Sequence, residues 1–102
     1  MIADEVCENK DEVDYRRIIL LGELVDYPIL TYRPSTLKPV TRFVIQENME
    51  RRIVEYKVKT IGALALWCRD YLRKESYVRI EGRIIKYNQI KADTVEEING
   101  CW

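Results

Sequence analysis

The feature that most constrains the fold is one helical pattern inside a chain that otherwise carries strand patterns. In ALALWCRDYLRK (63–74) the apolar residues recur at i, i+4, i+7 and i+8 (Leu64, Cys68, Tyr71 and Leu72). Outside this segment apolar and charged residues alternate, as in IVEYKVKTI (53–61) and YVRIEGRI (77–84), which is typical of half-buried strands. We expect a single helix between the third and fourth strands, with Cys68 and Tyr71 in the core.

The other strands are indicated by β-branched and leucine-rich runs separated by turn residues. RRIILLGELVDYPILTYR (16–33) predicts a long first strand, with a bend at Gly22 and an edge or break at Pro28. The turn PSTLKP connects it to a second strand, VTRFVIQ (40–46), as a hairpin. The remaining segments are a polar connection ENMERR (47–52), a tight turn KYNQ (86–89) and a fifth strand IKADTVEEI (90–98).

This order of elements predicts a mainly-β fold of a specific kind. Three strands, one helix and two strands fit the OB-fold, a five-stranded, partly open barrel with a helix at one end. Ferredoxin-like folds need two helices, and the chain shows one helical pattern. OB-folds bind oligonucleotides on the face of strands 2 and 3 and on loops 1–2 and 4–5, but a fold alone does not give a function.

The net charge of zero hides an uneven distribution along the 102 residues. Residues 1–14 hold six acids against Lys10, a charge of −5, so the rest of the chain carries +5. We therefore predict a flexible acidic arm (1–14) and one folded domain (15–102). A basic domain with an acidic arm favours a polyanion partner, with which the arm would compete for the same basic groove. An ordinary solvated surface explains the charge equally well.

Several classes of chemistry are disfavoured. The chain has no histidine, and Cys7, Cys68 and Cys101 form neither a disulfide framework nor a CxxC motif. No glycine-rich phosphate loop or metal-ligand cluster is present in the sequence, and Glu96 and Glu97 would point to opposite faces of a strand. We predict no enzyme activity, metal or cofactor. No apolar run approaches the roughly 20 residues of a membrane span, and the acidic start is not a signal peptide, so we expect a cytoplasmic protein.

Two segments carry a resemblance to a known family. RRIILLGELVDYPILTY and YLRKESYVRIEGRI resemble the first strand, and the helix end with the fourth strand, of bacterial single-stranded-DNA-binding proteins. TRFVIQ fits their second strand, so the resemblance covers about 16–86. The length and the PS…P…FVI hairpin are similar to a short branch of that family, the primosomal replication protein. The resemblance implies an OB-fold, a homodimer or homotetramer, sequence-nonspecific binding of single-stranded DNA, and replication or restart proteins as partners.

The chain departs from the family pattern where bases would stack on aromatic residues, contacts worth about 1–3 kcal/mol each. Glu55 and Ile61 stand at positions usually held by tryptophan and phenylalanine, and another tryptophan position falls near Arg51. A shift of one residue would put Tyr56 at the first position, but the alternation places Tyr56 on the opposite face. Loops 2–3 and 4–5 are shortened, and Glu75 stands where the family commonly has glycine.

The predicted binding residues form a basic stripe with possible extensions. The stripe comprises outward residues of strands two and three and the connection between them (Arg42, Lys57, Lys59, Arg51 and Arg52). Strand four could extend it through Arg79, Arg83 and Lys86, although these residues could equally pair with Glu81, Glu96 or Glu97. Tyr32 and Tyr87 could stack bases near loop tips or be ordinary exposed tyrosines.

The sequence therefore leads to two hypotheses from different classes. The first is non-catalytic binding of single-stranded DNA in replication, restart or recombination, with RNA as an open alternative. The second is an OB-fold protein–protein interaction module of the same family with little nucleic-acid binding, which the glutamate at position 55 favours.

Overall fold

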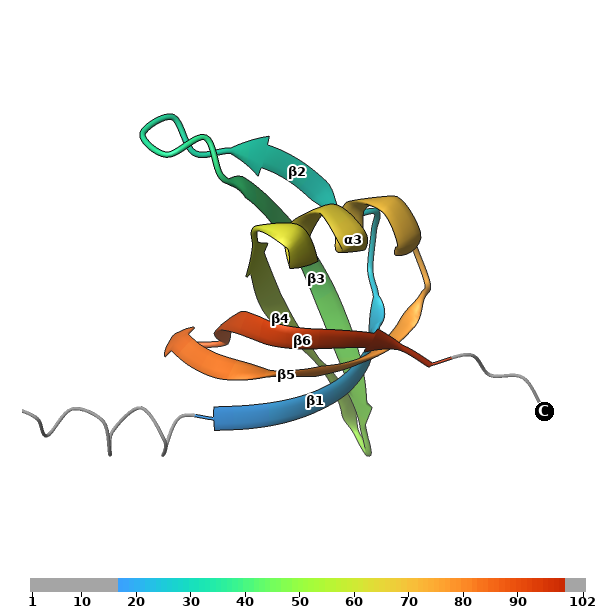
Figure 1. Ribbon diagram of the computed structural model, residues 1–102. Helices are drawn as coiled ribbons and strands as arrows, with labels where there is room; N and C mark the ends of the chain where they lie inside the picture. Colours follow the sequence, from blue (N-terminus) through green and yellow to red (C-terminus); the bar gives the residue numbers. More distant parts are fainter. Residues whose placement is uncertain (1–16, 99–102) are drawn as a thin grey trace, which may run out of the picture.

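The computed structural model describes residues 17–98 as a β-barrel with one helix (Figure 1). Its elements are, in chain order, β1 (Arg17–Leu24), β2 (Ile29–Tyr32), β3 (Pro39–Met49), β4 (Arg52–Ile61), α3 (Ala63–Tyr71), β5 (Tyr77–Lys86) and β6 (Gln89–Glu97). The predicted OB-fold order, with its helix after the third long strand, is confirmed. The predicted acidic arm (1–14), Cys7 and Cys101 lie outside the described residues.

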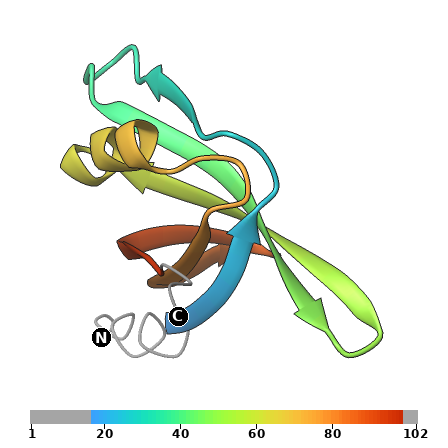
Figure 2. The same ribbon diagram turned by 90° about the vertical axis from the view of Figure 1, so that its right-hand side faces the viewer.

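The strands close into a barrel because β1 pairs with β5 along most of its length and with β3 at its end. The strand order is β1-β5-β6-β4-β3-β2, and the last residues of β1 turn to pair with β3. Most neighbours are antiparallel, whereas β4 and β6 are parallel over three residue pairs. The helix α3 covers one end of the barrel, and the β3–β4 hairpin projects from it (Figures 1 and 2).

Alternating side chains fill the barrel. Ile45, Val58, Ile80 and Ile90 are almost completely buried. On the helix, Ala65 and Cys68 face this core, followed by Leu72 directly after the helix. The prediction that Cys68 is in the core is confirmed, and the same prediction for Tyr71 is wrong. Because the buried stripe runs through 65, 68 and 72, Tyr71 points away and is 58% exposed, with its ring centroid 5.4 Å from that of Trp67.

Two segment boundaries become defined in the structure. The long run 16–33 forms two strands, β1 and β2, so of the edge or break predicted at Pro28 the break is confirmed. In the bend between the two strands the Tyr27 amide donates to Asp26 Oδ1. Pro28, which has no amide hydrogen, then precedes β2. The polar segment 47–52, predicted as a connection, is a turn only at residues 50 and 51. It continues β3 and β4 to the Met49–Arg52 pair as an exposed ribbon, which needs no buried apolar face.

Gly22 is the bending point that the sequence predicted. It lies where β1 leaves β5 and approaches β3. A Cβ atom at this position would lie 2.8 Å from the carbonyl oxygen of Gln46. The close crossing of the two strands therefore depends on the missing side chain.

Glu75 occupies a backbone conformation that favours glycine. It lies between α3 and β5 with φ 74°, and its amide donates to the Leu24 carbonyl at 3.0 Å. A non-glycine residue in the left-handed region is strained by about 1–2 kcal/mol. Glycine removes this strain, but it also makes the unfolded chain more flexible, and this offsets part of the gain in stability. We expect Glu75→Gly to raise the free energy of unfolding by about 0.5–1 kcal/mol in urea denaturation.

The neighbouring Lys74 gives the control for this prediction. It is exposed and has no positive φ, so Lys74→Gly should leave stability unchanged or lower it slightly. An equal gain in both variants would contradict the strain at Glu75.

Candidate functional site

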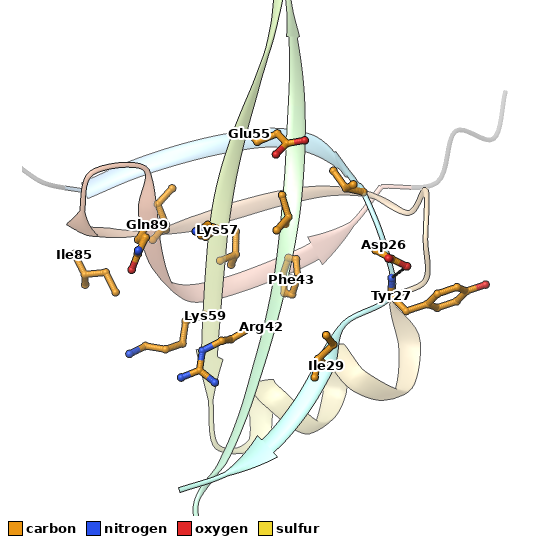
Figure 3. Close-up of a pocket in the computed structure, with 14 residues that line it drawn as sticks. Asp26, Tyr27, Ile29, Arg42, Phe43, Glu55, Lys57, Lys59, Ile85 and Gln89 are labelled. Atoms are coloured by element: carbon orange, nitrogen blue, oxygen red, sulfur yellow. Dashed lines mark hydrogen bonds between the residues drawn. The ribbon is translucent and has the colours of Figure 1, made fainter.

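A groove of about 560 Å³ lies on the outer side of β3 and β4 (Figure 3). These strands form its floor. The connection between β1 and β2 forms one wall, and the β5–β6 hairpin forms the other. The walls thus correspond to loops 1–2 and 4–5 of an OB-fold, so the groove is where this fold holds oligonucleotides.

The floor is made of cross-strand pairs whose charge changes along the groove. Arg42 lies opposite Lys59, Val44 opposite Lys57, and Gln46 opposite Glu55. The predicted alternation is confirmed on β4: Val58 is buried and Tyr56 packs against the core, whereas Glu55 and Lys57 are exposed. One end of the groove floor is therefore basic, and the other carries a carboxylate.

The basic end concentrates positive charge. The pKa of Lys59 lies below its ordinary value, first because burial disfavours the charged ammonium and then because of three nearby cations (Arg33, Arg42 and Lys91). Among residues 17–98, no carboxylate oxygen lies within ion-pair distance of the side chains of Arg42, Lys57 or Lys59. An anion in the groove would relieve this repulsion.

The walls add exposed apolar surface above the charged floor. Ile29 is 66% exposed on one side of the groove, and Ile85 is 41% exposed on the other. Tyr27 belongs to the same wall as Ile29, and its ring points outward from the rim (Figure 3). Apolar rims over a basic floor suit a ligand with flat apolar groups on a charged backbone.

The structure brings only part of the predicted stripe together. Arg42, Lys57 and Lys59 line the groove, as predicted. Arg51 and Arg52 lie at the tip of the β3–β4 hairpin, on the far side of Glu55 from Lys59. This hairpin projects from the barrel (Figure 2). Their separation follows from the length of the ribbon, which carries them beyond the barrel.

The predicted tyrosines and the strand-four cations lie outside the groove lining. Tyr32 ends β2 and Tyr87 lies in the β5–β6 turn, and both are exposed. Arg79 and Arg83 are half-buried on β5, where Lys86 is the last residue. Of the two outcomes left open for Arg83, the structure shows an ion pair, although its partner is Asp93 and not one of the predicted glutamates.

Sequence reasoning missed several residues of the site. Arg33 and Lys91 contribute to the charge around Lys59, and Ile29, Tyr27 and Ile85 form the walls. Lys91 could have been found, because it alternates with Ile90 and Ala92 on the last strand. The wall residues carry no such signal, since their position depends on where the loops meet the sheet.

The described residues offer little for catalysis. Burial raises the pKa of the Cys68 thiol to about 11, so it is protonated near neutral pH and inaccessible inside the core. Within 17–98, no group of three or more histidine, cysteine, aspartate or glutamate side chains could hold a metal ion. No helix in that range is long and apolar enough to cross a membrane.

Comparison with solved structures identifies similar barrels. The SSB domain of a Synechococcus sp. protein is 28% identical with a TM-score of 0.73, over 79% of this chain and 93% of that one. The single-stranded DNA binding protein from Thermus aquaticus is 28% identical with a TM-score of 0.73, over 82% of this chain and 40% of that one. This chain thus spans less than half of the Thermus protein.

A more distant match shows the fold alone. The second single-stranded DNA binding protein from Mycobacterium smegmatis is 17% identical with a TM-score of 0.71, over 80% of this chain and 87% of that one. No protein-family model matches the chain, and no curated protein sequence matches it significantly. The comparisons therefore support an SSB-like OB-fold.

Proposed function

We propose that this protein binds single-stranded DNA in the groove, without catalysis and without base specificity. The observation that carries this proposal is the basic end of the β3–β4 floor, where Arg42, Lys57 and Lys59 have no carboxylate partner among the described residues. The similarity to the SSB domain from Synechococcus sp. and to the single-stranded DNA binding protein from Thermus aquaticus supports it.

The groove would hold the strand mainly by its phosphates. Lysine and arginine side chains that neutralise phosphates release counterions, which makes the affinity depend strongly on salt. Lys59 gains most, because a phosphate offsets the repulsion from its cationic neighbours and raises its pKa again. Ile29 and Ile85 contact bases from the two walls. With Glu55 in place of an aromatic platform, stacking on the floor contributes little.

The experiment that tests this function is a titration of a fluorescent thymidine 30-mer by anisotropy, with a duplex control. We expect preference for the single strand at low salt. Three phosphate contacts predict a slope of about −2 for log K against log salt concentration, from about −0.7 per contact. Absence of binding at low salt would overturn the proposed function. Comparing the affinities for a thymidine 30-mer and a uridine 30-mer distinguishes binding of DNA from binding of RNA.

A second candidate function is a protein-interaction module. Glu55 favours it, because a carboxylate in the groove repels phosphates and accepts hydrogen bonds from protein donors. Charge reversal at Lys57 and Lys59 separates the two functions: it abolishes DNA binding under the first and leaves partner binding intact under the second.

The host process and the assembly are part of the same proposal. We place the protein in the cytoplasm, with replication or restart proteins as partners, in the manner of the primosomal replication protein. Self-association as a homodimer or homotetramer is supported by Ile19 and Leu21, which are exposed on the outer face of β1. Sedimentation equilibrium measures the molecular mass of the protein in solution. The mass of a monomer at micromolar concentration would exclude the homodimer and the homotetramer.

A further inference from the structure

A row of basic residues crosses the barrel beyond the groove. The cross-strand register pairs Arg42 with Lys59, Lys59 with Lys91, Lys91 with Arg83, and Arg83 with Arg17. Five neighbouring strands each contribute one cation, and all five residues are exposed or half-buried. We call this row the basic band. At about 4.8 Å between strands it spans about 19 Å.

The last three cations of the basic band surround one carboxylate. Asp93 Oδ2 lies 3.6 Å from Arg17 Nη1 and 3.9 Å from Arg83 Nε, and Asp93 Oδ1 lies 3.8 Å from Lys91 Nζ. Asp93 is the extra residue of a β-bulge, because Glu81 pairs with Thr94 and Gly82 with Ala92. The bulge therefore inserts a single carboxylate among three cations.

This cluster is poorly explained as a device for stability. Three cations with one carboxylate leave a net charge of +2, and like charges on neighbouring strands destabilise the sheet. The cationic side chains are 37–49% exposed, so their ion pairs with Asp93 contribute little. An arrangement of this kind is instead suited to a second anion from solution, since three donors exceed what one carboxylate accepts.

We propose that Arg17, Arg83 and Lys91 form a second phosphate site, in which the Asp93 carboxylate competes with the phosphate of a bound strand. This rests on the proposed function: a single strand that leaves the groove at Lys59 meets Lys91 on the adjacent strand and continues to Arg17. At about 3.4 Å per nucleotide, the band accommodates about five stacked nucleotides. Asp93 keeps the site occupied until that strand arrives.

The test is removal of the competing carboxylate by Asp93→Asn. We expect its affinity for the thymidine 30-mer to rise about 3–10-fold at low salt, with a salt slope steeper by about 0.7, as one additional phosphate contact predicts. The matched control is Glu96→Gln, which makes the same charge change on the same strand at an exposed residue that forms no ion pair among residues 17–98. An equal gain in the control would overturn the proposal, because general charge would then explain it.

A second variant tests the site without relying on the folding of Asp93→Asn. Arg17→Gln, at the exposed start of β1, should lower the affinity of the wild-type background about 3-fold. When Arg17→Gln is combined with Asp93→Asn, it should remove most of the rise in affinity that Asp93→Asn produces alone. If the wild type binds the 30-mer and neither variant changes the affinity, the proposal of a second phosphate site is wrong. Binding of the strand in the groove would still stand. If the wild type binds no single strand, the proposed function itself fails.

Discussion

Replacing Lys59 with glutamate will weaken binding of the thymidine 30-mer by about 100-fold at low salt. The exchange removes one phosphate contact and places a negative charge where the phosphate lies, which together cost about 2–3 kcal/mol at an effective dielectric constant near 20. The slope of log K against log salt concentration should also become shallower by about 0.7, which is the value for one missing phosphate contact on a single strand. Anisotropy at several salt concentrations measures both quantities.

Urea denaturation of Lys59→Glu separates loss of binding from loss of folding. Burial, the first cause of the lowered pKa of Lys59, disfavours a charged glutamate as well, whereas the neighbouring cations attract it. We therefore expect the free energy of unfolding to change little. Lys74→Glu makes the same charge change at an exposed residue outside the groove and should change the affinity less than 3-fold. Equal losses in both variants would show that binding follows total charge and not the groove.

Gly82→Ala will destabilise the barrel by about 3 kcal/mol or more. A Cβ atom at Gly82 would clash with the Lys91 carbonyl oxygen and would lie 2.8 Å from the Ala92 Cα. Both atoms belong to the β6 backbone, which cannot move away without breaking its pairing with β5. Urea denaturation, followed by the far-ultraviolet circular dichroism of the sheet, measures the change.

Gly62 provides a matched control with the same substitution. It has φ 76°, and a Cβ there meets no atom within 4 Å. Gly62→Ala therefore adds backbone strain alone, about 1–2 kcal/mol. Of the two variants, Gly82→Ala should lose clearly more stability. Comparable losses of stability would mean that β6 shifts to accommodate the methyl group. The close approach of β6 would then not require glycine at position 82.

The strand faces could be predicted from the sequence because they depend on a local rule. Alternation alone places Lys57 and Lys59 outward and Val58 inward, and the structure agrees. The basic band could not be predicted, because Lys59 meets Lys91 only through the parallel pairing that closes the barrel. Asp93 reaches its three cations through a bulge, a feature that no local pattern in IKADTVEEI indicates. Tyr71 fits the helical spacing from Leu64 that predicts a core position, but the buried stripe runs through 65, 68 and 72, and Tyr71 lies beside it.

The β5–β6 turn has a consequence for how fast a ligand is captured. The Asn88 carbonyl accepts a hydrogen bond from the Lys57 amide, and the Asn88 side-chain amide donates to the Glu55 carbonyl, both at 3.0 Å. These two bonds hold one wall of the groove against its floor. The groove is thus preorganised, and a flexible strand supplies nearly all of the ordering entropy lost on binding. Encounter then depends on long-range attraction to the basic end, and association slows as salt shortens the reach of that field.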